Sequence, residues 1–270
     1  MSIVPLPLLF LFLLIGNIIL FSLFFIWAKL KDDYSVIDIC WSLGFVLQIL
    51  IISALNHLNG FILGPGHFLI LFIVLIWAIR LASYIGLRNL KKGEDERYTA
   101  WREDWRPKVT LNFYFRVYIL QAFLNIIVGT GIVLTFAQPV IIEGRHIIVA
   151  TTVSLFGILY EAVADYQKDR FKKQPSNKDK PCRVGLWYYS RHPNYFGEII
   201  FWWGLYFFAL PTEVAWYAWF GPLFITFFLI KVSGVPLLTE KYKTRPLYAD
   251  YIETTNLFFP WPPRLKRSLK

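Results

Sequence analysis

Residues 4–29 read VPLPLLFLFLLIGNIILFSLFFIWAK, an apolar run whose first charged residue is its last. A helix needs roughly 20 predominantly apolar residues to cross the hydrocarbon core of a bilayer. The run exceeds that length, no Lys or Arg precedes it, and no small-residue cleavage site closes it. It is therefore not typical of a signal peptide, and we interpret it as the first membrane span.

Six further apolar runs follow along the chain. They cover residues 35–55, 67–87, 111–137, 147–166, 195–210 and 216–232. The composition agrees, because 56% of the 270 residues are hydrophobic and 19% are aromatic, which is too apolar for a typical soluble domain. The sequence therefore predicts an all-α fold, a polytopic membrane bundle of about seven transmembrane helices formed by residues 1–270 as a single domain.

The lysines and arginines predict the orientation of the bundle, since cytoplasmic loops carry the positive excess. Residues 80–108, 168–191 and 231–270 hold eight Lys or Arg residues each, and only Arg145 falls on the opposite side. We therefore expect the N-terminus outside and the C-terminus inside. This topology and the attraction to anionic lipid explain the net charge of +10 better than a nucleic-acid partner does.

Several common site chemistries are missing from the sequence. Cys40 and Cys182 lie far apart, so neither a disulfide framework nor a zinc-finger spacing is indicated. The four histidines are spread over loops on both sides of the expected bundle, and no metal site is predicted. The GxGxxG, P-loop, HExxH and GxSxG patterns do not occur in a suitable context.

Polar and ionisable residues recur at helical spacing on four of the expected spans, always in the cytosolic half. Such residues are costly inside a membrane and mark functional sites by default. Turned inward, they would line a polar cavity open to the cytosol. The alternative is an interfacial role, pairing with headgroups and with each other. The stripes are Asp38, Trp41, Ser42 and Phe45; Arg80, Tyr84 and Arg88; Glu161, Asp165 and Lys168; and Asn194, Glu198 and Trp202.

The most informative segment is residues 185–198, which read GLWYYSRHPNYFGE. Gly185 permits a turn and Pro193 suits the first turn of a helix. A helix start beside Arg191 is a suitable phosphate site. A basic loop that only satisfies the topology is the alternative. Further phosphate candidates lie upstream: Lys172, Lys173, Lys178, Lys180 and Arg183.

This segment, with Asp165, Phe171, Arg88 and the earlier runs WAIRLASY (77–84) and GEDERY (93–98), resembles bacterial membrane proteins grouped with the steroid 5-alpha-reductases. The likeness extends over residues 35–260 and is most specific in residues 185–198. Related enzymes include sterol reductases and the isoprenylcysteine carboxyl methyltransferases, which share the Asn-Tyr-x-Gly-Glu region. The resemblance implies a multi-pass reductase of the bacterial inner membrane, with its active site open to the cytosol.

The resemblance also implies an NADPH-dependent oxidoreductase that reduces a carbon–carbon double bond conjugated to a carbonyl in a lipid or steroid-like substrate. It places the catalytic pair on Asp38 and Tyr84, with Tyr84 donating to the developing enolate and Asp38 orienting it. The chain departs from the animal enzymes, which have a Gln-Glu pair where it reads Val36-Ile37-Asp38-Ile39. The implied cofactor contacts are Asp165, Lys172, Arg183, Arg191, Asn194, Glu198 and Tyr251, with Arg80 and Arg88 beside Tyr84.

Two other functions stay open. The Asn194–Glu198 region is shared with methyltransferases that use S-adenosylmethionine, although the basic loop favours a phosphate-bearing cofactor. A non-catalytic lipid-binding or transport protein is the second, but no pair of similar halves with broken helices is visible.

The expected partners are a lipidic enone and membrane lipids, without nucleic acid or an obligatory protein partner. The aromatic, proline-rich residues 258–263 suit the membrane surface.

Overall fold

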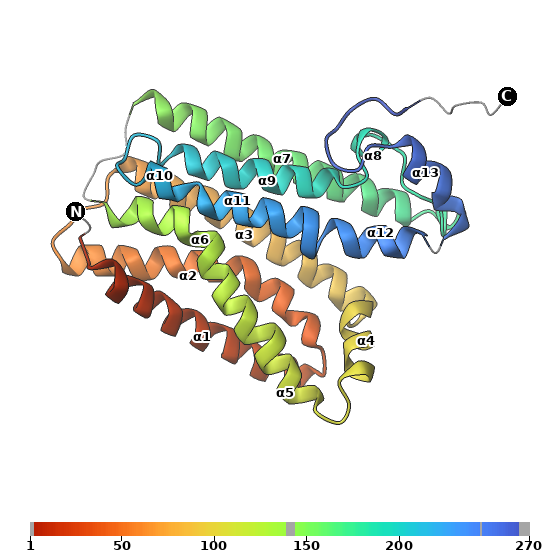
Figure 1. Cartoon of the computed structure of the whole chain (residues 1–270), viewed down its shortest axis with the longest axis horizontal. Coiled ribbons are helices and arrows are strands. Elements are labelled where there is room, and N and C mark those ends of the chain that lie inside the picture. The colour runs from red at the N-terminus through yellow and green to blue at the C-terminus, as the bar shows by residue number, and fades with distance from the viewer. Residues whose placement is uncertain (1–2, 139–143, 244, 265–270) are drawn as a thin grey trace. The chain divides into compact units, whose positions relative to one another are not determined.

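A computed structural model of the chain describes residues 3–138, 144–243 and 245–264. All regular structure in these ranges is helical, which confirms the predicted all-α fold (Figure 1). The chain divides into two compact units, and the single domain expected for residues 1–270 stays a prediction. We call them the N-terminal unit (Met1–Ile148 and Tyr206–Gly221) and the C-terminal unit (Val149–Leu205 and Pro222–Lys270).

The N-terminal unit is built around α2, which packs against three other long helices. A short 3₁₀ turn, η1 (Tyr34–Val36), leads into α2. The short helix α10 (Ala215–Ala218) packs against α6, the last long helix of this unit. The α5–α6 segment is one continuous helical run with a π-helical segment, η2, between α5 and α6. The long elements are α1 (Leu6–Lys31), α2 (Ile37–Leu58), α3 (Pro65–Lys92), α5 (Val109–Phe113), η2 (Tyr114–Ile119) and α6 (Leu120–Ala137).

Three buried carboxamides join α1, α2 and α6 in the interior of this unit. The Asn125 Oδ1 atom accepts hydrogen bonds from Asn17 Nδ2 at 3.1 Å and Gln48 Nε2 at 2.7 Å. Asn125 Nδ2 donates to the Trp41 carbonyl at 2.8 Å. Gly44 lies directly against the Asn125 amide, where a Cβ atom would collide with it. Interhelical hydrogen bonds of this kind contribute about 0.6 to 2 kcal/mol each inside a membrane.

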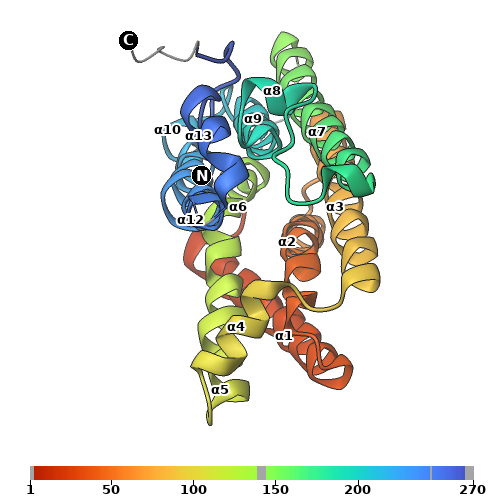
Figure 2. The same cartoon turned by 90° about the vertical axis from the view of Figure 1, so that its right-hand side faces the viewer.

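A short helix, α4 (Glu96–Asp104), lies across the ends of α1 and α2 (Figures 1 and 2). The chain reaches it through Gly93, whose φ of 76° is a left-handed conformation that glycine adopts without strain. Tyr98 of α4 is buried and stacks on Phe113, which in turn stacks on Tyr34. The part of the basic segment 80–108 that follows the expected span at 67–87 therefore contains a packed helix.

The C-terminal unit contains most of α7 (Arg145–Lys172) and the helix α9 (Pro193–Phe207), which run antiparallel. Their backbones touch at glycines: a Cβ atom on Gly197 would lie 2.6 Å from the Glu161 nitrogen, and one on Gly204 would lie 2.5 Å from the Ser154 nitrogen. The remaining elements are η3 (Pro175–Asn177), α8 (Leu186–Tyr189), α11 (Phe220–Phe227), η4 (Phe228–Val232), α12 (Val235–Lys243), η5 (Pro246–Tyr248) and α13 (Ala249–Thr254).

Six segments among the described residues are long and apolar enough to cross a membrane, one fewer than the sequence predicts. The missing one is α9, whose 15 residues are about 22 Å long against a hydrocarbon core of about 30 Å. The six are Leu6–Lys31, Tyr34–Leu58, Pro65–Leu90, Val109–Ala137, Arg145–Lys172 and Ala215–Val232.

The packing of α9 gives its direction relative to the neighbouring helices. Besides α7, α9 is antiparallel to α11 and η4, because Trp203 Nε1 donates to Thr226 Oγ1 at 3.2 Å while Gly234 lies against Tyr195. The α7 span and the later span therefore run in the same direction. Two consecutive candidate spans with one direction need a return of the chain between them, and α9 runs in that return direction, as the predicted seventh span would.

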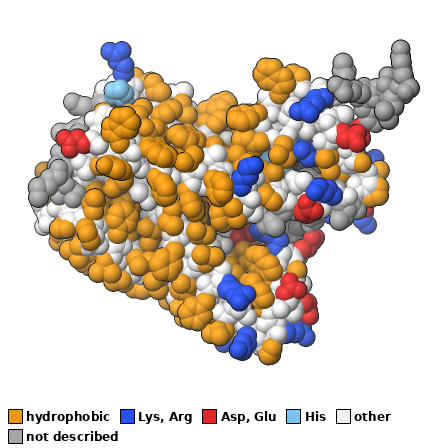
Figure 3. Space-filling view, in the orientation of Figure 1, with side chains coloured by type: hydrophobic (Ala, Val, Ile, Leu, Met, Phe, Trp, Pro, Cys, Tyr) orange, Lys and Arg blue, Asp and Glu red, His pale blue; other side chains and the backbone are white. Residues whose placement is uncertain are grey.

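The long helices of the N-terminal unit present apolar side chains outward. On α1, Leu11, Ile19 and Leu23 are exposed, as expected for side chains that face lipid tails. Figure 3 shows this apolar surface over α1, with charged side chains of the N-terminal unit near α4 and α5 and other charged side chains over the region of α12 and α13. The distribution confirms a multi-pass membrane protein with polar helix ends.

Candidate functional site

The loop before α9 in the C-terminal unit has the local structure that its sequence predicts. Gly185 adopts a φ of 55° and packs on the Gln167 side chain, which also accepts the Leu186 N–H at 2.8 Å. The α8 turn ends at Tyr189, and α9 begins at Pro193. Arg191 and His192 are thus held in the short link between the two helices.

Ionisable side chains are buried around this link. Arg191 is 8% exposed and lies just before α9, while Glu198 is 9% exposed on its second turn. Glu161 and Asp165 on α7 are 3% and 5% exposed. Glu161 of α7 packs directly against Gly197 of α9. The buried carboxylates of the two helices therefore lie at about the same height along the helix pair. Removing charged groups from water is costly, so such a group of residues is a functional-site candidate.

His192 is a residue of this cluster that the site prediction left out. Its side chain is fully buried, and its ring stacks on Tyr195 at a centroid distance of 5.5 Å. Burial, assisted by the positive charges of Lys168 and Arg191, lowers the pKa of His192 to about 3. The imidazole is therefore neutral at physiological pH. The Arg-His-Pro-Asn run was its only signal in the sequence.

Two predicted cofactor contacts take part in the architecture of the same unit. Tyr251 is buried, and its hydroxyl donates to the Trp187 carbonyl at 2.9 Å. Arg183 forms an ion pair with Asp250 at 2.6 Å and lies over the Tyr251 ring. Tyr251 therefore orients the loop backbone. Asn194 is half-buried at the start of α9, and Lys172 is exposed on the last turn of α7.

The predicted catalytic acid lies in the N-terminal unit, in the first turn of α2. Asp38 Oδ1 accepts the Tyr98 hydroxyl at 2.7 Å, and Asp38 Oδ2 accepts Arg97 Nη2 at 2.9 Å. Burial and the neighbouring Asp38 carboxylate raise the pKa of Tyr98 well above its ordinary value, which keeps its hydroxyl protonated as a donor. Neither Tyr98 nor Arg97 was predicted to be a partner of Asp38.

The predicted stripe of Arg80, Tyr84 and Arg88 lies on α3, and its three side chains have different surroundings. Arg80 and Tyr84 are half-buried one turn apart. Arg88 lies near Asp95 at 3.7 Å and donates from Nε to Asn89 at 3.3 Å. Burial alone would raise the pKa of Asp95, but the hydrogen bond and charge of Arg97 lower it overall. The catalytic role of Tyr84 stays a prediction.

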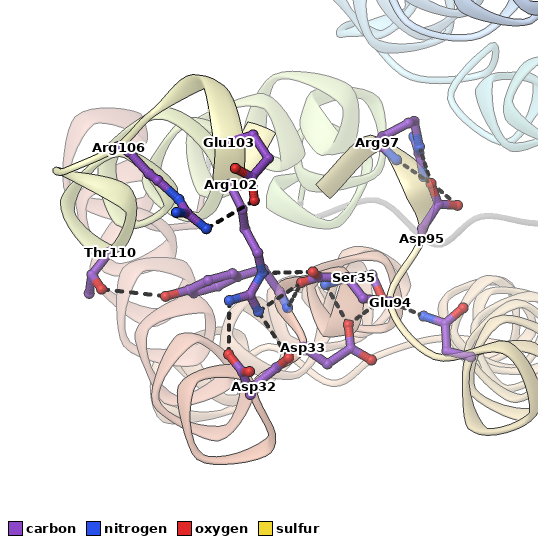
Figure 4. A network of polar contacts seen from close by, with 12 residues as sticks. Asp32, Asp33, Ser35, Glu94, Asp95, Arg97, Arg102, Glu103, Arg106 and Thr110 are labelled. Atoms are coloured by element: carbon purple, nitrogen blue, oxygen red, sulfur yellow. Dashed lines mark hydrogen bonds and ion pairs between the residues drawn. The ribbon is translucent and has the colours of Figure 1, made fainter. Parts of the chain in front are cut away.

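A second polar network surrounds Arg102 on α4, shown in Figure 4. Arg102 binds Asp32 at 2.8 Å and Glu94 at 2.7 Å, and its guanidinium lies 4.5 Å from the Tyr34 ring centre. Glu94 also accepts the Tyr34 N–H at 2.7 Å. These contacts join the ends of α1 and α3 to α4, and we call them the α4 cap. Their mutual pairing indicates a structural role.

The comparisons with known proteins give one match. A family model described as "Protein of unknown function (DUF1295)" matches residues 24–255. No curated protein and no solved structure matches the chain. The matched range includes the buried charges of the C-terminal unit and the Asp38 group of the N-terminal unit.

Proposed function

This chain belongs to the DUF1295 family of proteins of unknown function, and we propose that it is an NADPH-dependent membrane oxidoreductase. The proposed reaction is the reduction of a carbon–carbon double bond conjugated to a carbonyl in a lipid or steroid-like substrate. The proposal combines the resemblance of residues 185–198 to steroid 5-alpha-reductases with the chemistry of the residues buried around that segment.

One observation carries the proposal, namely the burial of charged side chains around the start of α9. A soluble cofactor that carries both phosphates and hydroxyl groups needs cations and carboxylates at one site. The C-terminal unit supplies buried Arg191 from the loop and buried Asp165 and Glu198 from the helices. Charges of this kind in a membrane protein mark a binding site more often than they stabilise a fold.

The residues present fit NADPH by their donor chemistry. Arginine binds phosphate in a bidentate manner, and Arg191 would hold the pyrophosphate, with Arg183 and Lys172 as candidates for the remaining phosphate. The carboxylates of Asp165 and Glu198 would accept hydrogen bonds from ribose hydroxyls or from the nicotinamide amide. Asn194 can both donate and accept. S-adenosylmethionine carries one carboxylate and no phosphate, so it would match one of these cations and leave the others without an anionic partner.

The proposed reaction assigns separate roles to residues of the N-terminal unit. The cofactor would supply a hydride to the β carbon of the enone. Tyr84 would donate a hydrogen bond to the carbonyl oxygen, where negative charge develops. Asp38 would act as its orienting carboxylate. The hydrogen bonds from Tyr98 and Arg97 support that role, since they fix the direction in which the Asp38 carboxylate points.

Ligand binding to purified protein tests the proposal. NADPH should raise the apparent melting temperature, because a ligand that binds only the native state stabilises it by mass action. Arg191→Ala should abolish most of this shift. Arg170→Ala removes the same charge from an exposed position at the end of α7 and should leave the shift intact. Stabilisation by S-adenosylmethionine instead would indicate a methyltransferase, and no shift with either ligand would contradict both enzymes.

A further inference from the structure

The last described residues of the chain, Thr255–Arg264, fold back over the link between α8 and α9. We call this segment the C-terminal strap. The Arg191 N–H donates to the Asn256 carbonyl at 2.9 Å, and the Trp261 N–H donates to the Tyr189 carbonyl at 3.2 Å. Between them, Ser190 Oγ donates to the Phe258 carbonyl at 2.7 Å. Tyr189 at the end of α8 and the link residues Ser190 and Arg191 are therefore all hydrogen-bonded to the strap.

The strap is itself held in shape. Asn256 Nδ2 donates to the Trp261 carbonyl at 2.7 Å, and the Arg264 N–H donates to the Thr254 carbonyl at 2.8 Å. Phe258 is buried and packs edge-to-face on Phe196 of α9. Because the strap has a fixed conformation, any surface that contacts it also acts on the link.

The outer face of the strap is aromatic. Phe259 is 71% exposed and Trp261 is 70% exposed, while Phe258 between the strap and α9 is buried. Tyr188 and Tyr189 of α8 extend this face, and both are also exposed. Prolines at 260, 262 and 263 alternate with the aromatic residues and prevent the segment from forming a helix that would cover them.

The packing of α9 places this face at the boundary of the membrane. Since Gly197 lies opposite Glu161 in the antiparallel pair, Pro193 lies level with Asp165. Beyond Asp165, α7 changes from apolar to charged, with Lys168, Asp169, Arg170 and Lys172 in its last turns. The start of α9, and the strap bonded to the residues just before it, are therefore at the level where the hydrocarbon core ends.

The chemistry of the strap matches the headgroup region of a bilayer. Tryptophan and tyrosine are enriched at that level because their rings are apolar at one end and polar at the other. Arg264 belongs to the strap, and the sequence continues with Lys266, Arg267 and Lys270. Basic residues beside an interfacial segment strengthen its binding to anionic lipid.

We propose that the C-terminal strap inserts Phe259 and Trp261 into the headgroup region of the protein's own bilayer and, by doing so, holds the Ser190–His192 link in place. The bilayer is then part of what shapes the link before α9. This inference does not depend on NADPH, since the contacts that carry it lie within the protein and at the lipid surface.

Depth-dependent fluorescence quenching tests the lipid contact. Cys40 and Cys182 are buried, and both would be replaced by alanine before a fluorophore is attached to Trp261→Cys or, as control, to the exposed Lys178→Cys. In vesicles of mixed anionic and zwitterionic phospholipid, a spin label on the headgroup should quench position 261 more strongly than position 178. Iodide in the water should show the reverse order. Equal quenching at both positions, or protection of position 261 from both quenchers, would overturn the lipid assignment in favour of water or a protein partner.

Hydrogen exchange, measured without any nucleotide, tests whether the strap holds the Ser190–His192 link in place. In vesicles, Phe259→Ser with Trp261→Ser should increase the exchange rate of the Arg191 amide by about tenfold, because its acceptor, the Asn256 carbonyl, is released by local opening. Unchanged exchange in α1 and α7 would show that the variant is folded. Trp216→Ser, at an exposed tryptophan of the N-terminal unit, is the matched control and should change nothing at Arg191. Unchanged exchange at Arg191 in the double variant would overturn the proposal, whatever the outcome of nucleotide binding.

Discussion

The two units hold their charged residues in different ways. In the α4 cap, Arg102 is bound by Asp32 and Glu94, and Asp32 is largely exposed to water. In the C-terminal unit, Arg191, Asp165 and Glu161 are almost fully removed from water. Exposed pairs cost little to form and contribute little, whereas a buried charge is retained only where something requires it. The two groups therefore differ in role: the α4 cap fixes the position of a helix, whereas the buried charges of the C-terminal unit are suited to binding a ligand.

The largest expected effect concerns the contact that brings the buried charges together. Gly197→Leu should destabilise the protein by about 3 kcal/mol or more, because its side chain would meet the backbone of Glu161 and force α7 and α9 apart. Thermal unfolding measured in detergent tests this expectation. Gly86→Ala is the control, since its Cβ would lie 3.5 Å from Ile39, which is an ordinary contact. A stable Gly197→Leu protein would contradict the close α7–α9 packing.

A second substitution tests the proposed chemistry in the N-terminal unit. Tyr84→Phe should lower the rate of hydride transfer to an enone about a hundredfold, or about 3 kcal/mol, while cofactor affinity stays nearly constant. The reason is that a donor to the developing enolate acts mainly in the transition state. Single-turnover oxidation of bound NADPH measures the rate. A folded Tyr84→Phe protein with the wild-type rate would show that Tyr84 is not the donor.

The buried charges of the C-terminal unit should matter for binding more than for folding. Asn194→Ala should weaken NADPH binding by about 1 to 3 kcal/mol if it removes a hydrogen bond to the cofactor. Calorimetric titration gives the affinity, and the melting temperature without ligand gives the stability. Unchanged affinity in both Asn194→Ala and Arg191→Ala would place the cofactor elsewhere.

The α4 cap should show the opposite pattern. Arg102→Ala should reduce stability by about 1 to 2 kcal/mol, because Glu94 loses its charged partner while half-buried. Cofactor affinity should not change. Glu103→Ala removes an exposed ion pair from the same helix and should have almost no effect on stability. If Arg102→Ala weakened cofactor binding without loss of stability, the cap would belong to the site.

At neutral pH the smallest expected effect is a pH dependence from His192, which begins only as the pH falls below about 6.5. Its pKa is about 3 in the folded protein, against an ordinary value of 6.5. Below pH 6.5 the unfolded chain binds a proton that the folded chain does not, so stability should fall by about 1 kcal/mol per pH unit as pH decreases toward 3. His192→Gln should remove this part of the slope between pH 6.5 and 5. An identical slope in wild type and variant would assign the acid sensitivity to other groups.

Local rules predicted much of this structure from the sequence. The span positions follow from length and apolarity, and the glycine turn at 185 and the helix start at Pro193 follow from backbone preferences of single residues. The burial of Glu161, Asp165 and Glu198 was also expected, because their spacing places them on helix faces that turn inward. Each of these features is determined within one or two turns of chain.

The features that the sequence did not predict depend on contacts between distant segments. Tyr98 bonds to Asp38 across 60 residues, and nothing in the charged sequence around it indicates a buried tyrosine. The short length of α9 was hidden by apolar residues that continue beyond its end. The hydrogen bond from the Tyr251 hydroxyl to the Trp187 carbonyl joins residues 64 positions apart and was not predicted, while the expected role of Tyr251 at the cofactor stays a prediction. Tertiary contacts of this kind leave no periodic signal.

The separation between Asp38 and its donors also has a consequence for biosynthesis. The chain is made from the N-terminus, so α2 leaves the ribosome while Arg97 and Tyr98, 59 and 60 residues later, are still to be translated. At about 5 to 20 residues per second, that interval is about 3 to 12 seconds. During it, the Asp38 carboxylate needs water or lipid headgroups to solvate it, and α2 must stay shallow at that end. Until α4 is translated, that carboxylate lacks the two donors that hold it in the folded protein.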